Sequence, residues 1–247
     1  MNATFRKIFS ILIVFLAYPC IHAQQRPVLH AHNDYTKKHP LFDALDAGIQ
    51  SIEIDVYYHK KRVVVSHIPL FLGAKKDLHT LYGKAFDRAA QEKRLPDSLT
   101  LMWDIKSGHD STTWYTLEEI QKLADNTPGT EFRILLTGAY RREQAISFPG
   151  LNIVYDASLS AFLHGAEIVP GTGRLSCSYG SFRKTLRELG PEKVRERLRL
   201  ASAQGMETRV WGAGNRRKTW HYLAGMGIRI INCDQYEKAR HFLSQYP

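Results

Sequence analysis

The sequence predicts an α/β protein built as a single (β/α)8 barrel, in which some distortion of the regular barrel is expected. Strand-like and helix-like segments alternate along the chain, which is typical of a parallel sheet covered by helices. The strand-like segments number about eight, and a chain of 247 residues has the usual length of such a barrel. No change in composition divides the chain, so one domain is expected.

Each expected strand is a short run of β-branched or aliphatic residues. We expect strands at Pro27–Ala31, Ser51–Tyr57, Arg62–Ser66, Leu99–Lys106, Glu131–Thr137, Asn152–Tyr155, Arg174–Ser178, Glu207–Trp211 and Ile228–Cys233. Helices are expected where apolar residues recur three or four positions apart, at Pro40–Ala47, Leu117–Ala124, Arg183–Gln204, Arg216–Ala224 and Tyr236–Leu243. The segment Ile68–Asp97 follows neither pattern and is expected to be a long irregular loop or an active-site lid.

The N-terminus has the features of a secretory signal peptide. Arg6 and Lys7 precede an apolar run, Ile8–Ala17, and Ala23 offers a small residue before the polar pair that follows it. The apolar run is too short for an ordinary transmembrane helix. We therefore expect a signal peptide over residues 1–23, a domain over 24–247, and a secreted or periplasmic protein.

The cysteines are too few for a disulfide-rich scaffold. Cys20 raises the alternative of a lipid anchor, although Tyr18-Pro19 is a poor context for lipidation; a retained N-terminal anchor is the other alternative. After cleavage only Cys177 and Cys233 remain. Both lie in apolar strand-like runs, so buried free thiols are expected.

The chain is basic, with a formal net charge of +10 that falls to +8 when Arg6 and Lys7 are removed. The excess is concentrated between Arg183 and Arg199, where basic residues share the outer face of an amphipathic helix. Aromatic residues are not interleaved with them, so no nucleic-acid partner is expected. Peripheral attraction to an anionic membrane surface remains open.

The run Ile52–Val56 places aliphatic residues on one face of a strand and Glu53 and Asp55 on the other. In a barrel the aliphatic face packs against helices, so both carboxylates point inward. Two such carboxylates repel each other and lose hydration, and they require a cation or bound protons. A hard divalent cation suits carboxylate oxygens. Alone, the motif fits a solvent-facing edge strand equally well.

Other strands repeat this pattern near their C-terminal ends, where a (β/α)8 barrel builds its active site. Asp104 and Lys106 share one face of their strand, and His67 lies just beyond another. His30 and His32 share a face at the end of the first strand. The coincidence of these ionisable groups favours a site over an ordinary polar surface.

Four motifs resemble those of the phospholipase C-like phosphodiesterases, a superfamily that includes glycerophosphodiester phosphodiesterases and phosphatidylinositol phospholipases C. They are His32–Tyr35, Pro40–Leu45, Glu53–Val56 and Val65–His67. The resemblance is closest to the branch typified by the altered-inheritance-of-mitochondria-6 proteins. It is strong over residues 28–106 and weak beyond them. The bacterial glycerophosphodiesterase motifs His-Arg-Gly and Glu-Asn-Thr are absent, which puts that specificity in doubt more than phosphodiester chemistry.

The resemblance implies a set of site residues. The catalytic pair is His32 and His67, and the ligands of one divalent cation, Mg²⁺ or Ca²⁺, are Glu53, Asp55, Asp104 and Asn33. Lys106 matches a cation of the family that can contact substrate. Trp211, at a strand end, is a candidate for stacking on a head group. His30, Asn232 and Asp234 are weaker candidates for supporting or pocket contacts.

The expected function is that of a secreted, metal-dependent phosphoric diester hydrolase of lipid metabolism. Its substrate is expected to be a phospholipid-derived or glycerophosphodiester-type molecule. Metal-bound carboxylates can help neutralise the phosphate, while two histidines exchange protons near neutral pH. The sequence leaves open which histidine is the base, and whether a cyclic phosphate forms first.

Two alternatives belong to other functional classes. A barrel of this kind can bind phosphorylated head groups without turnover. The pair His30 and His32 also resembles the His-x-His of amidohydrolase-type metal hydrolases, although only His164 offers a later histidine ligand in the middle of the chain.

Overall fold

The structure is a computed structural model that describes residues 26–246. The predicted signal peptide lies outside the described residues. Within them, none of the helices combines the length and apolar character that crossing a membrane requires.

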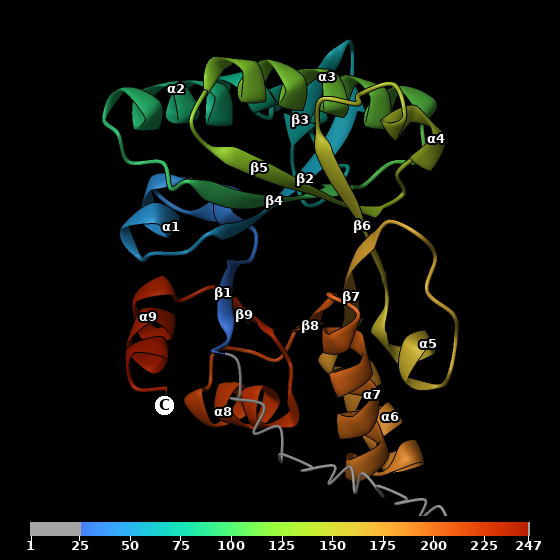
Figure 1. The fold of residues 1–247 in the computed structure, drawn as a ribbon. Helices are drawn as coiled ribbons and strands as arrows, with labels where there is room; N and C mark the ends of the chain where they lie inside the picture. Colours follow the sequence, from blue (N-terminus) through green and yellow to red (C-terminus); the bar gives the residue numbers. More distant parts are fainter. Residues whose placement is uncertain (1–25, 247) are drawn as a thin grey trace, which may run out of the picture.

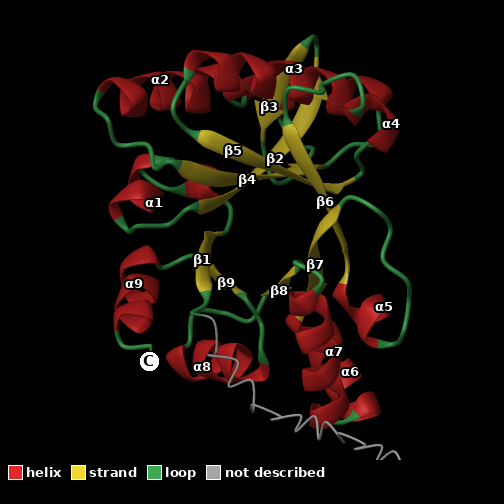
Figure 2. Ribbon diagram, in the orientation of Figure 1, coloured by secondary structure: helices red, strands yellow, loops and turns green. Residues whose placement is uncertain are grey.

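Eight parallel strands of the described chain close into a barrel surrounded by helices (Figures 1 and 2). The order around the barrel is β1-β9-β8-β7-β6-β5-β4-β2, and pairing of β2 with β1 closes it. The predicted (β/α)8 barrel is thus confirmed. The barrel strands are β1 (Val28–Ala31), β2 (Ser51–His59), β4 (Ser98–Ile105), β5 (Glu131–Gly138), β6 (Asn152–Ser158), β7 (Thr172–Ser178), β8 (Glu207–Trp211) and β9 (Ile230–Cys233).

A ninth strand, β3 (Arg62–Val65), stands outside the barrel order because it pairs antiparallel with the far end of β2. The two strands form a hairpin in which His59 pairs with Arg62. This return brings the residues after β3 back to the barrel, where the Ser66 N–H donates to the Asp55 carbonyl at 3.1 Å. His67 is thereby held beside the end of the parallel sheet.

The helices follow the barrel strands and cover their outer faces (Figure 2). They are α1 (Phe42–Asp46), α2 (Lys84–Gln91), α3 (Asp110–Asn126), α4 (Arg142–Ala145), α5 (Leu159–Leu163), α6 (Tyr179–Leu189), α7 (Pro191–Ala203), α8 (Arg217–Met226) and α9 (Tyr236–Ser244). Short 3-10 turns lie at Asp34–Thr36 and Leu72–Ala74, and a π-helical turn at His79–Gly83.

Two expectations about helices require correction. The single basic helix expected over Arg183–Gln204 is two helices, α6 and α7, because Gly190 has φ of 78° and Pro191 starts the second helix. The segment Ile68–Asp97 is not irregular throughout, since it contains α2, whose Phe86 and Ala89 are buried. The helix is only eight residues long, so its apolar period is too brief to stand out in the sequence.

The strands of the barrel have an apolar outer face and a polar inner face. On β2 the side chains of Ile52, Ile54 and Val56 are fully buried in the hydrophobic core between sheet and helices. Cys177 and Cys233 are buried free thiols, as expected.

Ion pairs fill the barrel interior near the N-terminal ends of the strands. Glu207 accepts from Arg133 Nη1 at 2.6 Å and from Arg174 Nη2 at 2.9 Å. Arg174 is fully buried, and its guanidinium also lies 3.7 Å from the sulfur of Met102. Compensated charge here takes the place of the aliphatic layers usual inside such barrels.

Candidate active site

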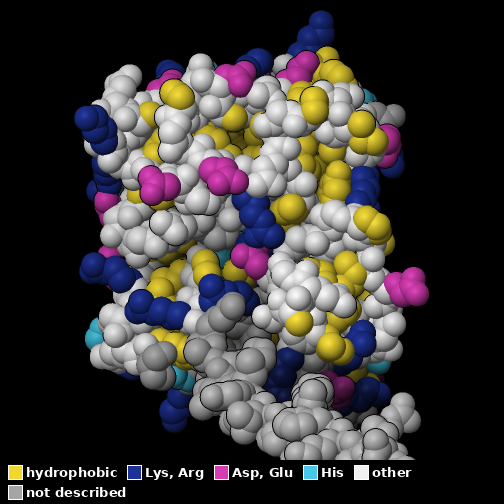
Figure 3. All heavy atoms as spheres, viewed as in Figure 1, with side chains coloured by type: hydrophobic (Ala, Val, Ile, Leu, Met, Phe, Trp, Pro, Cys, Tyr) yellow, Lys and Arg dark blue, Asp and Glu magenta, His cyan; other side chains and the backbone are white. Residues whose placement is uncertain are grey.

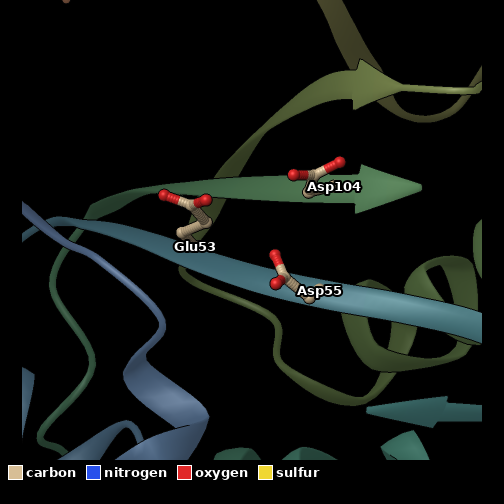
Figure 4. A group of neighbouring side chains, drawn as sticks. All are labelled: Glu53, Asp55 and Asp104. Carbon is tan, nitrogen blue, oxygen red and sulfur yellow. The ribbon is translucent and has the colours of Figure 1, made fainter. Parts of the chain in front are cut away.

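Three carboxylates meet where β2 and β4 run side by side in the barrel. Glu53 and Asp55 extend from β2, and Asp104 extends from β4 directly opposite Asp55 in the strand register. Each residue offers an oxygen that lies within 4.8 Å of the others, and Figure 4 shows the three side chains on the same side of the sheet. The period of two in these strands thus produces the inward acidic group that the sequence predicts.

Asp55 is fully buried and is contacted on one oxygen by three groups. Its Oδ2 lies 2.6 Å from His67 Nδ1 and 3.3 Å from Lys106 Nζ. The Tyr35 hydroxyl donates to the same oxygen at 2.7 Å. In contrast, the buried Oδ1 accepts no hydrogen bond from any described residue.

Lys106 lies between the two aspartates, with its Nζ 2.6 Å from Asp104 Oδ2. Burial raises the pKa of the Asp104 carboxyl, and the charges of Asp55 and Glu53 act in the same direction against the opposing effect of Lys106. Burial alone would lower the pKa of Lys106, but its hydrogen bond to Asp104 and the charge of Asp55 raise it. The ammonium is therefore the counter-ion of the group in this arrangement.

The charge of Glu53 is neutralised by Arg209 of β8. Its Oε2 accepts from the Arg209 guanidinium and lies 3.1 Å from Nε2 of His30. Burial opposes ionisation, but the charge of Arg209 and the contact with His30 hold the pKa of Glu53 well below its usual range. Burial also lowers the pKa of His30 to about 3, so this imidazole is neutral and supports Glu53.

Arg209 is in turn fixed by the last strand, because its Nε donates to Asn232 Oδ1 at 2.7 Å. The expected pocket contact of Asn232 is therefore a contact with this guanidinium. His30 is completed on its other side by Ser51, whose Oγ lies 2.7 Å from Nδ1.

The donor set fits a hard divalent cation. The buried Asp55 Oδ1 and Asn33 Oδ1 are acceptor oxygens that receive no hydrogen bond from the described residues. Unsatisfied buried oxygens are costly, and a cation that prefers oxygen ligands would satisfy them. Such an ion would share Asp55 and Asp104 with Lys106, whose Nζ contacts the other oxygen of Asp55.

His32 stands at the end of β1 and is oriented by Asp234. Its Nδ1 lies 2.7 Å from Asp234 Oδ1, which leaves Nε2 as the ring nitrogen available for proton transfer. Asn215 holds the carboxylate by donating to Oδ2 at 2.9 Å. Burial tends to lower the pKa of His32, but the hydrogen bond to Asp234 and the charge of Glu53 outweigh it and raise the pKa.

Some residues of the motif His32–Tyr35 belong to the site, and others stabilise the fold. Asp34 is fully buried and accepts from the Leu41 N–H and from the hydroxyls of Tyr82 and Tyr236, at 2.6 to 2.9 Å. It ties the β1–α1 turn to two distant helical segments. Asn33 adopts a left-handed conformation with φ of 49°, between this anchor and His32.

The structure brings most of the predicted residues together. His67 is bonded to Asp55, Lys106 to both aspartates, and Glu53 lies beside Asp55 on β2. Trp211 ends β8 and is 46% exposed; its role in stacking stays a prediction. His164 lies 3.1 Å from Glu188 at the end of α6, a position that gives the amidohydrolase alternative no third ligand.

Two contacting residues, Arg209 and Tyr35, were missed by the sequence analysis. A signal for Arg209 was present, because Glu207, Arg209 and Trp211 share one face of β8. Tyr35 lay inside a recognised motif, but nothing in its spacing indicates a bond to Asp55.

Residues 21–95 match the AIM6-like phosphodiesterase domain. The chain is 25% identical over 287 residues to altered inheritance of mitochondria protein 6 of Lachancea thermotolerans, with 87% of the chain covered. It is 24% identical to the Eremothecium gossypii protein of the same name, covering 87% of the chain and 70% of that protein. The chain spans 65% of the length of the Lachancea relative.

Two solved structures share the fold. A glycerophosphodiester phosphodiesterase from Parabacteroides distasonis superposes with a TM-score of 0.58 and 18% identity, covering 89% of this chain and 97% of the other. A glycerophosphodiester phosphodiesterase from Agrobacterium tumefaciens gives a TM-score of 0.55 at 14% identity, covering 88% and 99%. The predicted resemblance to the phospholipase C-like superfamily and its AIM6-like branch is thus confirmed.

Proposed function

Because the chain is related to the AIM6-like branch of the phospholipase C-like phosphodiesterases, we propose that it is a metal-dependent phosphoric diester hydrolase. The observation that carries the proposal is the pairing of each histidine with a carboxylate beside the acidic group. His67 Nδ1 lies 2.6 Å from Asp55, and His32 Nδ1 lies 2.7 Å from Asp234. Two oriented imidazoles beside a cation-binding set suit phosphodiester cleavage better than binding alone.

A divalent cation held by Glu53, Asp55, Asp104 and Asn33 would neutralise charge on a nonbridging phosphate oxygen. The histidines supply the proton transfers. With its Nδ1 engaged by a carboxylate, each ring presents Nε2, which can take a proton from the attacking hydroxyl or give one to the leaving oxygen. Arg209 holds Glu53 ionised and in place from beneath.

The substrate we propose is a phospholipid-derived or glycerophosphodiester-type molecule, as in the glycerophosphodiester phosphodiesterases that share the fold. The residue we propose for stacking on a head group is Trp211, which ends β8 with 46% of its surface exposed. Lys106, whose Nζ contacts both Asp55 and Asp104, would offer its remaining donor capacity to a phosphate oxygen. We further propose that the protein acts in lipid metabolism as a secreted or periplasmic enzyme, on the strength of its N-terminal sequence.

The test is turnover of bis(nitrophenyl) phosphate with EDTA, Mg²⁺ or Ca²⁺. We expect activity with at least one ion and none with EDTA. Glu53→Gln and Asp55→Asn should each lose both turnover and bound ion, measured by calorimetry, while Glu237→Gln on α9, where the side chain is 73% exposed, serves as the matched control. Tight ion binding without turnover of this or any other diester would instead favour a non-catalytic head-group-binding barrel.

A further inference from the structure

The segment that follows His67 exposes three large apolar side chains to solvent. Ile68 is 47% exposed, Leu70 is 55% exposed and Phe71 is 83% exposed. The Phe71 backbone is left-handed with φ of 55°, an uncommon conformation for a bulky residue. Isolated exposed apolar residues are ordinary, but a cluster beside a catalytic mouth indicates an interaction surface. Residues 68–71 are called the rim loop below.

Unpaired cations flank the rim loop. Lys60 and Lys61 form the tip of the β2–β3 hairpin, and Lys75 and Lys76 follow the loop. All four are exposed, and none pairs with a carboxylate of the described chain. Residues 59–77 contain five Lys and Arg against one acidic residue, a balance of +4. In Figure 3, Lys and Arg side chains project beyond the molecule where Figure 1 places this hairpin, with hydrophobic side chains beneath them.

The rim loop and the hairpin tip form one surface. Arg62 Nη2 donates to the Gly73 carbonyl at 3.3 Å, which ties the turn that directly follows the rim loop to the hairpin. Arg62 also lies 3.7 Å from Asp77, so the one carboxylate of the segment is already paired. The hairpin is supported near its tip by Tyr58, which stacks on Tyr115 of α3 with ring centroids 4.7 Å apart.

We propose that this surface docks the enzyme on an anionic phospholipid bilayer, with the rim loop inserted among the lipids and the hairpin lysines on their head groups. Apolar side chains gain by entering the interface, and lysines gain from the negative surface potential. Because the loop starts at His67, docking brings the catalytic mouth to the head groups. A consequence of docking is that the substrate is a bilayer phospholipid rather than a soluble diester. This consequence rests on the proposed function.

The basic helices α6 and α7 are a poorer membrane surface than the sequence indicated. Several of their cations are engaged within the protein: Lys184 lies 3.8 Å from Glu188, and Arg195 lies 2.7 Å from Glu192. Arg197 donates to the Phe162 carbonyl at 2.6 Å. No apolar cluster as exposed as the rim loop accompanies these helices in the described chain.

The test places a fluorophore in the loop. Phe71→Trp is mixed, in EDTA, with vesicles of phosphatidylcholine containing about 30 mol % phosphatidylglycerol. Relative to wild type, whose four tryptophans include the exposed Trp211, its emission should shift to the blue and be quenched by brominated lipid. The matched control is Ile146→Trp, since Ile146 is 80% exposed on the connection that leads to the start of β6; its emission should change no more than that of wild type.

Binding to the same vesicles should respond to both parts of the surface. The double change Leu70→Ser with Phe71→Ser should weaken binding about tenfold or more, while turnover of soluble bis(nitrophenyl) phosphate stays unchanged. Lys60→Gln with Lys61→Gln should weaken binding about tenfold on anionic vesicles only. An unshifted Phe71→Trp spectrum, or equal binding by wild type and both doubles, would overturn the inference. Rim-dependent binding by a protein that cleaves no diester would defeat the proposed function alone.

Discussion

Two inward carboxylates of the barrel, Glu207 near the N-terminal ends of the strands and Asp104 at the mouth, are treated in opposite ways. Near the N-terminal ends of the strands, two guanidiniums clamp Glu207 and, against the effect of burial, lower the pKa of its carboxyl. At the mouth, burial and the neighbouring charges of Asp55 and Glu53 raise the pKa of Asp104, although Lys106 lies 2.6 Å away.

The difference lies in the partners. Arginines on β5 and β7 hold Glu207 from rigid strands with planar, always-charged groups. The mouth uses a flexible lysine, a histidine and a tyrosine, all on the same oxygen of Asp55, and leaves the other oxygen without a partner. The network around Glu207, near the N-terminal ends of the strands, is thus closed and structural. The mouth keeps capacity for an exchangeable cation and for proton transfer.

The largest expected effect is on turnover at the mouth. His32→Ala and His67→Ala should each lower turnover of a phosphodiester by about 10²–10⁴-fold, the usual range for a general acid or base. Both variants should retain the divalent ion, because the proposed ligands are oxygens. Steady-state kinetics and calorimetry on the same preparations measure the two properties separately.

Leaving-group dependence separates the roles of the two histidines. The histidine that protonates the leaving oxygen should matter less for a nitrophenyl ester than for an alkyl ester, since an activated leaving group needs little protonation. Equal losses on both esters in both variants would make the histidines positioning groups. Full activity in either variant would remove that histidine from the mechanism.

The next largest effect is on the stability that the ion-pair network around Glu207 contributes. Arg174→Met should reduce the free energy of unfolding by about 3–5 kcal/mol, because it removes one partner of a buried charged network. Turnover per folded molecule should stay close to wild type. Urea unfolding measures the change, with Arg195→Met as the control at an exposed pair worth about 0–1 kcal/mol. A variant as stable as wild type would show that the network around Glu207 contributes little to the free energy of unfolding.

The sequence predicts the barrel and the acidic group because both depend on local periods. Alternation of strand and helix patterns predicts the parallel sheet, and the period of two in β2 and β4 predicts that Glu53, Asp55 and Asp104 face one another. The break between α6 and α7 was also visible, as Gly190-Pro191, but the continuous helical pattern on both sides obscured it.

The compensation of charge was not predictable to the same degree. Arg209 pairs with Glu53 across 156 positions of the chain, and which inward residues meet depends on the stagger of the closed barrel. The sequence therefore indicates that Glu53 and Asp55 need a cation, but not that an arginine supplies it for Glu53 and a lysine for Asp55.

A smaller effect on stability is expected when the repulsion of Asp104 by Asp55 and Glu53 is relieved. Because the folded pKa of Asp104 is raised, its ionisation costs stability as pH rises through the unfolded value of about 3.9 toward the folded one. Asp104→Asn removes this cost at neutral pH, and the lost contact with Lys106 offsets part of the gain. In EDTA the variant should be more stable at pH 7 by less than about 1 kcal/mol.

That gain should shrink below the unfolded carboxyl pKa, where Asp104 is protonated in wild type as well. With saturating divalent ion the order should reverse, because only wild type offers the third carboxylate. Melting temperatures at acidic and neutral pH, with EDTA and with ion, measure both statements. A less stable variant in EDTA at neutral pH would mean that the Lys106 pair outweighs the repulsion.

The smallest effect concerns the pH profile of the mouth. The hydrogen bond that His32 donates to Asp234 and nearby negative charge raise the pKa of His32 against the effect of burial, so Asp234→Asn should lower it. The limb of the bell-shaped profile that reports His32 should then move to lower pH. If His32 is the base, the acidic limb moves and relative activity on the acidic side of the optimum rises. If His32 is the acid, the basic limb moves and activity falls above neutrality.

Asn215→Ala should give a smaller shift of the same sign, because Asn215 only steadies the carboxylate. A profile that drops in height without moving would show that Asp234 orients His32 but does not set its pKa.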